Sequence, residues 1–129
     1  MGELLREAVP ALAVDLVVPV PLSRPRLRAR GFNQALLLAE QVAETVHGAL
    51  TPDVLTRTDR PAQSGLSAAD RASNLNGVFA CPKPHDVRGC RILLVDDVIT
   101  TGATVSACAD TLARAGARRV SAIAFARDL

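Results

Sequence analysis

The residues best suited to chemistry lie in one short segment, in which two adjacent aspartates precede a turn of small and hydroxyl-bearing residues. Asp96 and Asp97 follow the apolar run Ile92–Val95. Neighbouring carboxylates can accept hydrogen bonds from the vicinal hydroxyls of a sugar, or they can hold a hydrated divalent ion. Asp96 and Asp97 are therefore the candidate catalytic and metal-binding residues of the chain.

The turn that follows the aspartates has the composition of a phosphate site. Glycine lets a backbone turn sharply and approach a ligand closely, and threonine hydroxyls donate hydrogen bonds. The turn opens onto a predicted helix, whose first N–H groups and dipole favour an anion. The predicted phosphate-binding residues are Thr100, Thr101, Gly102, Ala103 and Thr104. The alternative is that the aspartates only end a strand and that Thr101 or Thr104 caps a helix. A P-loop lysine and a Gly-x-Gly-x-x-Gly fingerprint are both absent from the sequence.

Strand-like and helix-like patterns alternate along the chain and place the aspartates at the end of the clearest strand. The expected strands are Val14–Val20, Val54–Arg57, Gly77–Ala80, Arg91–Val95 and Val120–Phe125. The expected helical segments are Leu4–Leu12, Phe32–His47 with Gly48 as its stop, a turn at Ser67–Ala72, and Thr104–Ala115. This order predicts an α/β fold: a mostly parallel open sheet with helices on both faces. Ligands of such sheets bind at the carboxyl ends of the strands.

A second candidate site is the basic segment Ser23–Gly31, which follows the first strand and is expected to be irregular. Arg24, Arg26, Arg28 and Arg30 alternate there with other residues. A guanidinium group pairs with phosphate oxygens in a bidentate manner. Arg30 is the best placed because it precedes Gly31. A solvated basic loop is the competing interpretation, and Asn33 and Gln34 could equally cap the following helix.

Composition excludes several classes of protein. The 129 residues are 49% hydrophobic, which suits one compact domain rather than a disordered chain. Aromatic residues make up 2% and the net charge is +2, so neither a stacking platform nor a strong polyanion field is indicated. The three cysteines form no Cys-x-x-Cys pair, which argues against a zinc site and for reduced thiols in the cytoplasm. No apolar stretch is long enough to span a membrane.

The segment Ile92–Thr104 resembles the phosphoribosyl pyrophosphate signature of type I phosphoribosyltransferases. Further stretches are similar to the ComF family of competence-associated, phosphoribosyltransferase-like proteins. These stretches are Val18–Leu22, Arg28–Gln34, Gln63 through Arg71 to Asn74, and Gly77–Phe79. The likeness covers about residue 14 to the end of the chain.

The resemblance implies a type I phosphoribosyltransferase-like domain over residues 1–129, without the cysteine-bearing zinc ribbon that usually precedes it in this family. It implies phosphoribosyl pyrophosphate as ligand and Mg²⁺ as cofactor. It assigns the turn of Pro21, Leu22 and Ser23 to the pyrophosphate, to which Arg30 is added on the physical grounds given above. Gln63 and Arg71 lie in a long polar stretch that is either a lid over the ligand or an ordinary surface loop.

Two functions follow as hypotheses. The first is an enzyme that transfers the phosphoribosyl group, with the help of Mg²⁺, to a nitrogen acceptor that the sequence does not identify. The second is a non-catalytic module that binds ribose phosphate or single-stranded DNA during DNA uptake. The expected partners are single-stranded DNA, a helicase-like competence protein, and a second copy of the chain in a homodimer.

Overall fold

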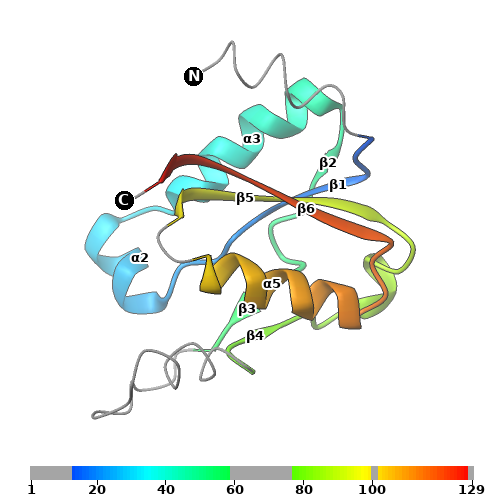
Figure 1. Ribbon diagram of the computed structural model, residues 1–129. Coiled ribbons are helices and arrows are strands. Elements are labelled where there is room, and N and C mark those ends of the chain that lie inside the picture. The colour runs from blue at the N-terminus through cyan, green and yellow to red at the C-terminus, as the bar shows by residue number, and fades with distance from the viewer. Residues whose placement is uncertain (1–12, 59–76, 100–101, 128–129) are drawn as a thin grey trace.

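The computed structural model describes residues 13–58, 77–99 and 102–127 (Figure 1). The strands are β1 (Leu16–Pro19), β2 (Ala49–Leu50), β3 (Thr56–Arg57), β4 (Phe79–Ala80), β5 (Arg91–Ile99) and β6 (Arg119–Arg127). The helices are α2 (Arg24–Arg30), α3 (Gln34–Val46) and α5 (Ala103–Arg114), with a short 3₁₀ turn at Pro84–Asp86. The expected helical segments Leu4–Leu12 and Ser67–Ala72 lie outside the described residues.

Four strands form a parallel sheet in the order β2-β1-β5-β6. Strand β5 lies inside the sheet, and its residues Ile92–Val95 are at most 2% exposed. A continuous run of branched apolar residues is what a parallel strand covered on both faces requires. The predicted parallel sheet is confirmed.

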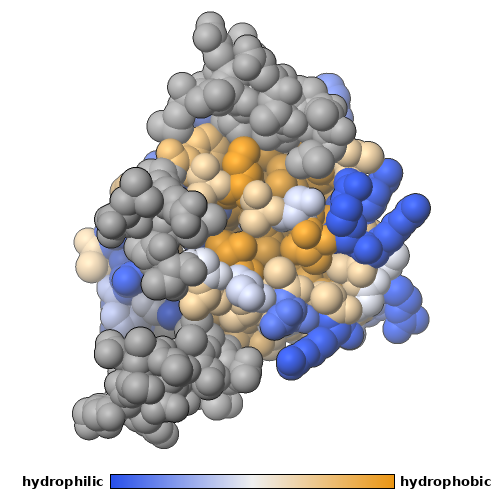
Figure 2. All heavy atoms as spheres, in the orientation of Figure 1, coloured by the Kyte–Doolittle hydropathy of each residue, from blue (hydrophilic) through white to orange (hydrophobic). Residues whose placement is uncertain are grey.

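Helices α3 and α5 lie on opposite faces of the sheet (Figure 1), and alternate residues of β1 and β5 pack against one or the other. Val17, Leu93 and Val95 pack against α3, which contributes Ala39 and Val42 among its buried residues. On the opposite face, residues such as Val18 and Leu94 pack against Cys108 and Leu112 of α5. Helices therefore cover both faces of the sheet, as predicted. Figure 2 shows the apolar residues gathered centrally and strongly hydrophilic residues at one border of the view.

Two short strands form a separate antiparallel ribbon beside α5. Thr56 of β3 pairs with Ala80 of β4, and Arg57 pairs with Phe79. Val54, Leu55 and Phe79 are buried in the same core as α5. The apolar residues thus anchor the ribbon and fix where Arg57 lies.

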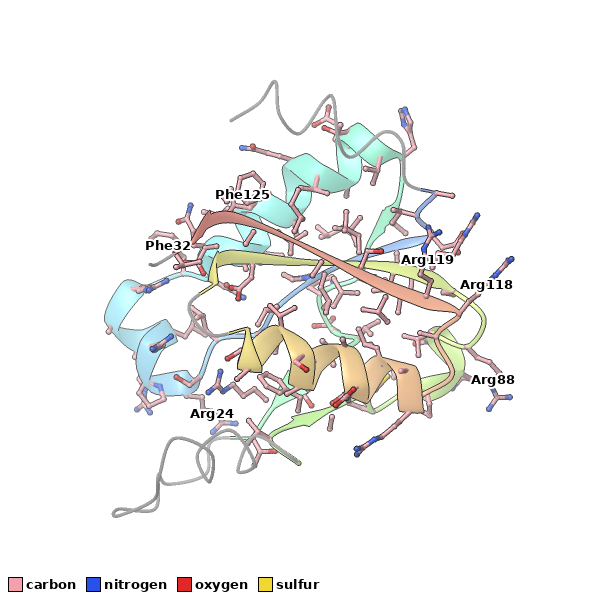
Figure 3. The ribbon with its side chains drawn as sticks, in the orientation of Figure 1. Arg24, Phe32, Arg88, Arg118, Arg119 and Phe125 are labelled. Carbon is pink, nitrogen blue, oxygen red and sulfur yellow. The ribbon has the colours of Figure 1, made fainter. Side chains whose placement is uncertain are left out.

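The starts of the sheet strands meet at a basic end of the molecule. Figure 3 shows Arg88, Arg118 and Arg119 at this end, away from α2. The backbone N–H of Arg91 donates to Asp15 Oδ2 at 2.7 Å, and its guanidinium donates to the two carboxylate oxygens at 3.1 and 3.0 Å. This clamp joins the start of β5 to the residue before β1 and therefore fixes their register.

The prediction that Ser23–Gly31 is irregular was wrong, because Arg24–Arg30 forms helix α2. The Ser23 side chain accepts a hydrogen bond from the backbone N–H of Arg26 at 3.4 Å, and Pro25 lies in the first turn, where its missing N–H costs nothing. Gly31 ends the helix in the left-handed conformation, with φ of 78°. The helix has no buried residue, so the apolar spacing that signals most helices is absent.

Two expectations about α3 were also wrong. The helix begins at Gln34 and not at Phe32, with Asn33 as its N-cap, and Phe32 is 47% exposed. The left-handed C-terminal residue is His47, with φ of 56°, and not Gly48. Gly48 is closely packed, since a Cβ there would lie 3.1 Å from Val17 Cγ2 and that side chain would have to move by a few tenths of an ångström.

Candidate functional site

A cavity of about 320 Å³ opens where β1 ends and α5 begins. Its walls come from the turn after β1, helix α2, strands β3 and β5, and the first turn of α5. The lining residues are Val20, Pro21, Leu22, Arg26, Arg30, Arg57, Asp96, Asp97, Val98, Gly102, Thr104 and Val105. The volume lies within the range of small-molecule sites, about 300–1,000 Å³. The cavity therefore brings together residues from both segments that the sequence singled out.

The two aspartates lie within β5 and not in a turn after it, because the strand continues to Ile99 instead of ending at Val95. Strand β1 stops pairing with β5 at Val95, to which Val20 donates the last backbone hydrogen bond at 2.9 Å. Beyond this point, among the strands that the structure describes, β5 pairs only with β6, through Asp96↔Ala124 and the following partners. The free edge of β5 opens onto the cavity, which explains how both carboxyl groups reach it.

Adjacent carboxyl groups have opposite pKa shifts here. Burial raises the pKa of Asp96 to about 6, and the hydrogen bond and negative charge of Asp97 add to the effect. Burial also acts to raise the pKa of Asp97, but hydrogen bonds from Asp96, Arg30 and the Val98 amide outweigh it and lower that pKa. Asp97 is therefore the permanent anion of the pair, and Asp96 is the carboxyl that takes up a proton near neutrality.

Helix α2 places two guanidinium groups at the cavity. Arg26 and Arg30 are one helical turn apart and both line it. Arg30 Nη1 lies 3.0 Å from Asp97 Oδ2, in an ion pair whose side chains are 45% and 21% exposed. The positive charge of Arg26 acts on Asp96 as well, and lowers its pKa slightly against the larger effect of burial.

Arg57 is a cavity residue that the sequence did not single out. It comes from β3, and its guanidinium carbon lies 5.3 Å from the centre of the Phe79 ring on β4. A guanidinium stacked on an aromatic face is held in place without losing its charge. The only sequence signal was a predicted short strand at Val54–Arg57. Its pairing with residues more than twenty positions later could not be read from the sequence.

The structure describes the predicted phosphate-binding turn from Gly102 onward. Gly102 is left-handed, with φ of 82°, and its carbonyl accepts from the Ser106 amide at 2.9 Å. Ala103 is the first residue of α5, and Gly102 and Thr104 line the cavity. The N-terminus of this twelve-residue helix therefore lies at the cavity, where its dipole favours an anion. Thr100 and Thr101 lie outside the described residues.

The predicted pyrophosphate residues divide into two groups. Pro21 and Leu22 line the cavity, as Arg30 does. Ser23 caps α2, so its side chain has a structural partner. The predicted lid residues Gln63 and Arg71 lie outside the described part of the chain.

A divalent ion would find only part of a coordination shell in the protein. Within residues 13–58, 77–99 and 102–127, no group of three or more His, Cys, Asp or Glu side chains could hold a metal. The cavity offers the two carboxyl groups of Asp96 and Asp97. This set fits Mg²⁺, which usually keeps several waters and is bound by one or two carboxylates together with substrate phosphates.

Comparisons with known proteins show the family of the chain. A family model described as the phosphoribosyl transferase domain matches residues 33–129. DNA utilization protein YhgH of Escherichia coli K12 is 40% identical over 116 residues, covering 89% of this chain and 50% of that protein. Competence protein ComFC of Bacillus subtilis is 36% identical over 114 residues, covering 88% of this chain and 45% of that protein.

Competence protein F of Haemophilus influenzae is also similar, with 34% identity over 115 residues. These relatives confirm the resemblance to the ComF family. The chain spans about half the length of the curated relatives it matches. No helix in the described part of the chain combines the length and apolarity that a membrane crossing requires.

Solved structures share the fold at low sequence identity. The purine phosphoribosyltransferase from Pyrococcus horikoshii superposes with a TM-score of 0.66 and 17% identity, covering 97% of this chain and 69% of that one. The adenine phosphoribosyltransferase from Saccharomyces cerevisiae gives a TM-score of 0.57 and 15% identity, covering 98% of this chain and 63% of that one. The fold is therefore that of a type I phosphoribosyltransferase.

Proposed function

The chain belongs to the phosphoribosyl transferase domain family, and on that basis we propose that its cavity binds phosphoribosyl pyrophosphate and transfers the phosphoribosyl group to a nitrogen acceptor. One observation carries the proposal. The carboxyl groups of Asp96 and Asp97, the N-terminus of α5 and three arginines all face a single cavity of about 320 Å³. A sugar carrying a phosphate at one end and a pyrophosphate at the other needs these three kinds of group.

The ribose hydroxyls bind the two aspartates in this proposal. Both carboxyl groups carry acceptor oxygens beyond those used by the amides of Asp97 and Val98. The 5-phosphate then lies at the start of α5, near Gly102 and Thr104. The remaining phosphates extend toward α2 and the β3–β4 ribbon.

The charge of the cavity suits a ligand with several negative charges. Arg26, Arg30 and Arg57 face Asp96 and Asp97, so the positive groups outnumber the negative ones by three to two. Arg30 and Arg57 are each held by a neighbour, Asp97 and Phe79 respectively. Partly pre-organised guanidinium groups recognise phosphate oxygens at less entropic cost than free side chains.

Mg²⁺ is part of the proposal, with Asp96 and Asp97 as its protein ligands. When bound together with the pyrophosphate, it supplies positive charge for the leaving group. The arginines add to that stabilisation. The carboxylates also stabilise the positive charge that develops on the sugar, since the transition state has oxocarbenium character.

The proposed transfer exchanges one bond at C1 of the ribose for another. The bond from C1 to the pyrophosphate oxygen breaks, and its electron pair leaves with pyrophosphate. The lone pair of the acceptor nitrogen forms the new bond to C1. Asp97 is the nearest candidate to receive the proton that the acceptor loses, because its carboxylate is held ionised and lies at the cavity.

Release of pyrophosphate tests the transfer. The protein is incubated with Mg²⁺, phosphoribosyl pyrophosphate labelled in its β-phosphate, and a panel of purine, pyrimidine and amine acceptors. We expect acceptor-dependent release that Asp96→Asn and Asp97→Asn each reduce by about a hundredfold, as expected for groups that stabilise developing charge. Binding of the labelled compound without release for any acceptor would contradict turnover.

A second candidate function is a module that binds single-stranded DNA without catalysis. The arginines of α2 form two rows about 200° apart around the helix. Arg26 and Arg30 line the cavity, while Arg24 and Arg28 form the other, exposed row. Relatives carry the names DNA utilization protein and competence protein. Phosphodiesters could therefore contact the outer row of α2.

Salt-dependent binding separates the two candidates. For a DNA module, the affinity for oligo(dT) falls with salt, and Arg24→Gln with Arg28→Gln lowers the slope of log K against log salt by about 1.4, at roughly 0.7 per contact. Asp96→Asn leaves this binding unchanged. Oligo(dT) affinity that is insensitive to the Arg24 and Arg28 substitutions would exclude this surface.

A further inference from the structure

We propose that Arg30 is a latch that couples the pyrophosphate side of the cavity to the ribose side. In the free protein, Arg30 forms an ion pair with the Asp97 carboxylate. A bound pyrophosphate draws Arg30 away and frees Asp97 for the ribose hydroxyls. This inference rests on the proposed function and adds an order of events to it. Arg30 thereby acts as a positioning residue for Asp97.

The first observation is that Asp97 is already engaged in the free protein. Its Oδ1 accepts from the backbone N–H of Val98 at 2.9 Å, and its Oδ2 accepts from Arg30 Nη1 at 3.0 Å. The hydrogen bond from the Val98 N–H lies within β5 and holds the Asp97 carboxyl group in place. The bond to Arg30 links residues 67 positions apart in the sequence. A ribose hydroxyl must therefore compete with a guanidinium for the Oδ2 atom.

The second step is chemical: a pyrophosphate in the same cavity would be a stronger partner for Arg30 than Asp97 is. A pyrophosphate group carries more charge than one carboxylate and offers oxygens on two phosphorus atoms. A guanidinium binds such groups in a bidentate manner. The Arg30 side chain is 45% exposed, so its present ion pair is only partly shielded from water. An ion pair of this kind stabilises weakly and exchanges for a better anion at little cost.

The third observation is that α2 has no residue in the buried core, so a shift of the helix would leave the core intact. Its seven residues include no buried one, and it ends immediately after Arg30 at the left-handed Gly31. Among the described residues, apart from its two chain neighbours, none has a heavy atom within 4 Å of the position that a Cβ on Gly31 would take. Asp97, in contrast, is fixed by the backbone of β5. The mobile partner of the pair is therefore Arg30.

Binding of ribose 5-phosphate, measured by calorimetry with and without inorganic pyrophosphate and Mg²⁺, tests the latch. In the unsubstituted protein, we expect pyrophosphate to increase the affinity for ribose 5-phosphate about fivefold, the size of effect that a partly exposed ion pair can supply. In Arg30→Gln, the affinity for ribose 5-phosphate alone should match the affinity that the unsubstituted protein shows in the presence of pyrophosphate. Pyrophosphate should then have no further effect on it.

Two further variants serve as controls. Arg30→Lys should restore part of the effect of pyrophosphate. Arg88→Gln, which removes an equal charge at the other end of the sheet, should behave like the unsubstituted protein.

The expected gain of affinity distinguishes a latch from a simple anion contact. If Arg30 only attracts phosphate, Arg30→Gln weakens ribose 5-phosphate binding, and the proposal is overturned. Equal affinity with and without pyrophosphate in the unsubstituted protein also overturns it, while the proposed function stands. Absence of ribose 5-phosphate binding under all conditions contradicts the proposed function itself.

A spectroscopic measurement reports on the latch independently of affinity. The ¹³C resonance of the Asp97 carboxyl carbon should move when pyrophosphate is added to the unsubstituted protein. In Arg30→Gln it should already lie near the shifted position and respond little. A resonance that pyrophosphate leaves unmoved in the unsubstituted protein, at saturating concentration, contradicts release of Arg30. Circular dichroism confirms that each variant is folded.

Discussion

At the scale of single residues, two carboxyl groups of identical chemistry acquire different roles from their surroundings. Asp96 is the more buried, and its pKa rises to about 6. Asp97 is held ionised by Arg30 and by the Val98 amide. A proton is therefore bound at Asp96 in the range where Asp97 keeps its charge. In the proposed function, this difference keeps Asp97 ionised, so its oxygens can accept hydrogen bonds from the ribose hydroxyls.

The raised pKa of Asp96 predicts a stability cost at neutral pH. The unfolded chain ionises Asp96 near its ordinary pKa of 3.8, and the folded protein does so near 6, so stability is lost as pH rises between these values. Asp96→Asn removes the titrating group. We expect the melting temperature of the variant to exceed that of the unsubstituted protein at pH 7.5. The difference in melting temperature should decrease as the pH falls from 6 to 4. A gain that is independent of pH would contradict the assignment.

Residues of the cavity could be predicted from the sequence where several of them lie in one short segment. Asp96, Asp97 and Gly102 lie in one segment, and all three line the cavity. Arg57 was missed because it reaches the cavity through the ribbon of β3 and β4, a tertiary pairing with no local pattern. The ion pair between Arg30 and Asp97 was missed for the same reason.

At the scale of elements, α2 is a helix defined by its ends and not by a buried face. Gly31→Ala places a side chain at φ of 78°, a conformation that costs a non-glycine residue roughly 1–2 kcal/mol. No atom lies close enough for a clash, so the cost is conformational. We expect α2 to fray and the affinity for phosphoribosyl pyrophosphate to fall, with a small change in unfolding free energy because α2 buries nothing.

Gly31→Asn is the matched control, since asparagine tolerates the left-handed region better than alanine. Ligand titration and chemical denaturation together measure both effects. The account of α2 is wrong if the alanine and asparagine variants lose affinity equally.

The clamp between Asp15 and Arg91 makes a prediction about β1 and β5. Hydrogen bonds from the side chain and the backbone N–H of Arg91 lower the pKa of Asp15 to about 2. The clamp therefore contributes stability above the ordinary pKa of 3.8, and loses it as pH falls through about 2. Asp15→Asn should lower the free energy of unfolding at pH 7. The difference between the variant and the unsubstituted protein should decrease as the pH falls from 4 to 2. Denaturant titrations measure this difference, and a constant difference across this range would refute the clamp. Asp53→Asn, at an exposed position, is the control.

The sequence predicted most elements that have an apolar pattern. Arg91–Val95 was recognised by its continuous apolar run, and the helix after Gly102 because its buried residues recur at the helical period. Helix α2 has no buried face, and the two-residue strand β2 is too short to show a period. The continuation of β5 to Ile99 depends on pairing with β6, which local residues do not encode.

At the scale of the whole molecule, the cysteine thiols differ in their exposure to solvent. Cys108 is 0% exposed, and burial, followed by the charge of Asp96, raises its pKa to about 12. Cys90 is only half-buried. Because only the thiolate reacts, we expect iodoacetamide to modify Cys108 at least about a hundredfold more slowly than Cys90 in the native protein. Peptide mass spectrometry against denaturant concentration measures both rates. Modification of Cys108 before the global unfolding transition would contradict its place between α5 and the sheet.

The binding of phosphoribosyl pyrophosphate is the central claim, and one calorimetric titration tests it most directly. Phosphoribosyl pyrophosphate with Mg²⁺ is titrated into the unsubstituted protein, into the double variant Asp96→Asn with Asp97→Asn, and into Arg88→Gln. The account predicts saturable binding of one ligand per chain, an affinity at least about tenfold lower in the double variant, and no change in Arg88→Gln. Equal affinity in the double variant and the unsubstituted protein, or no binding to either, would contradict it.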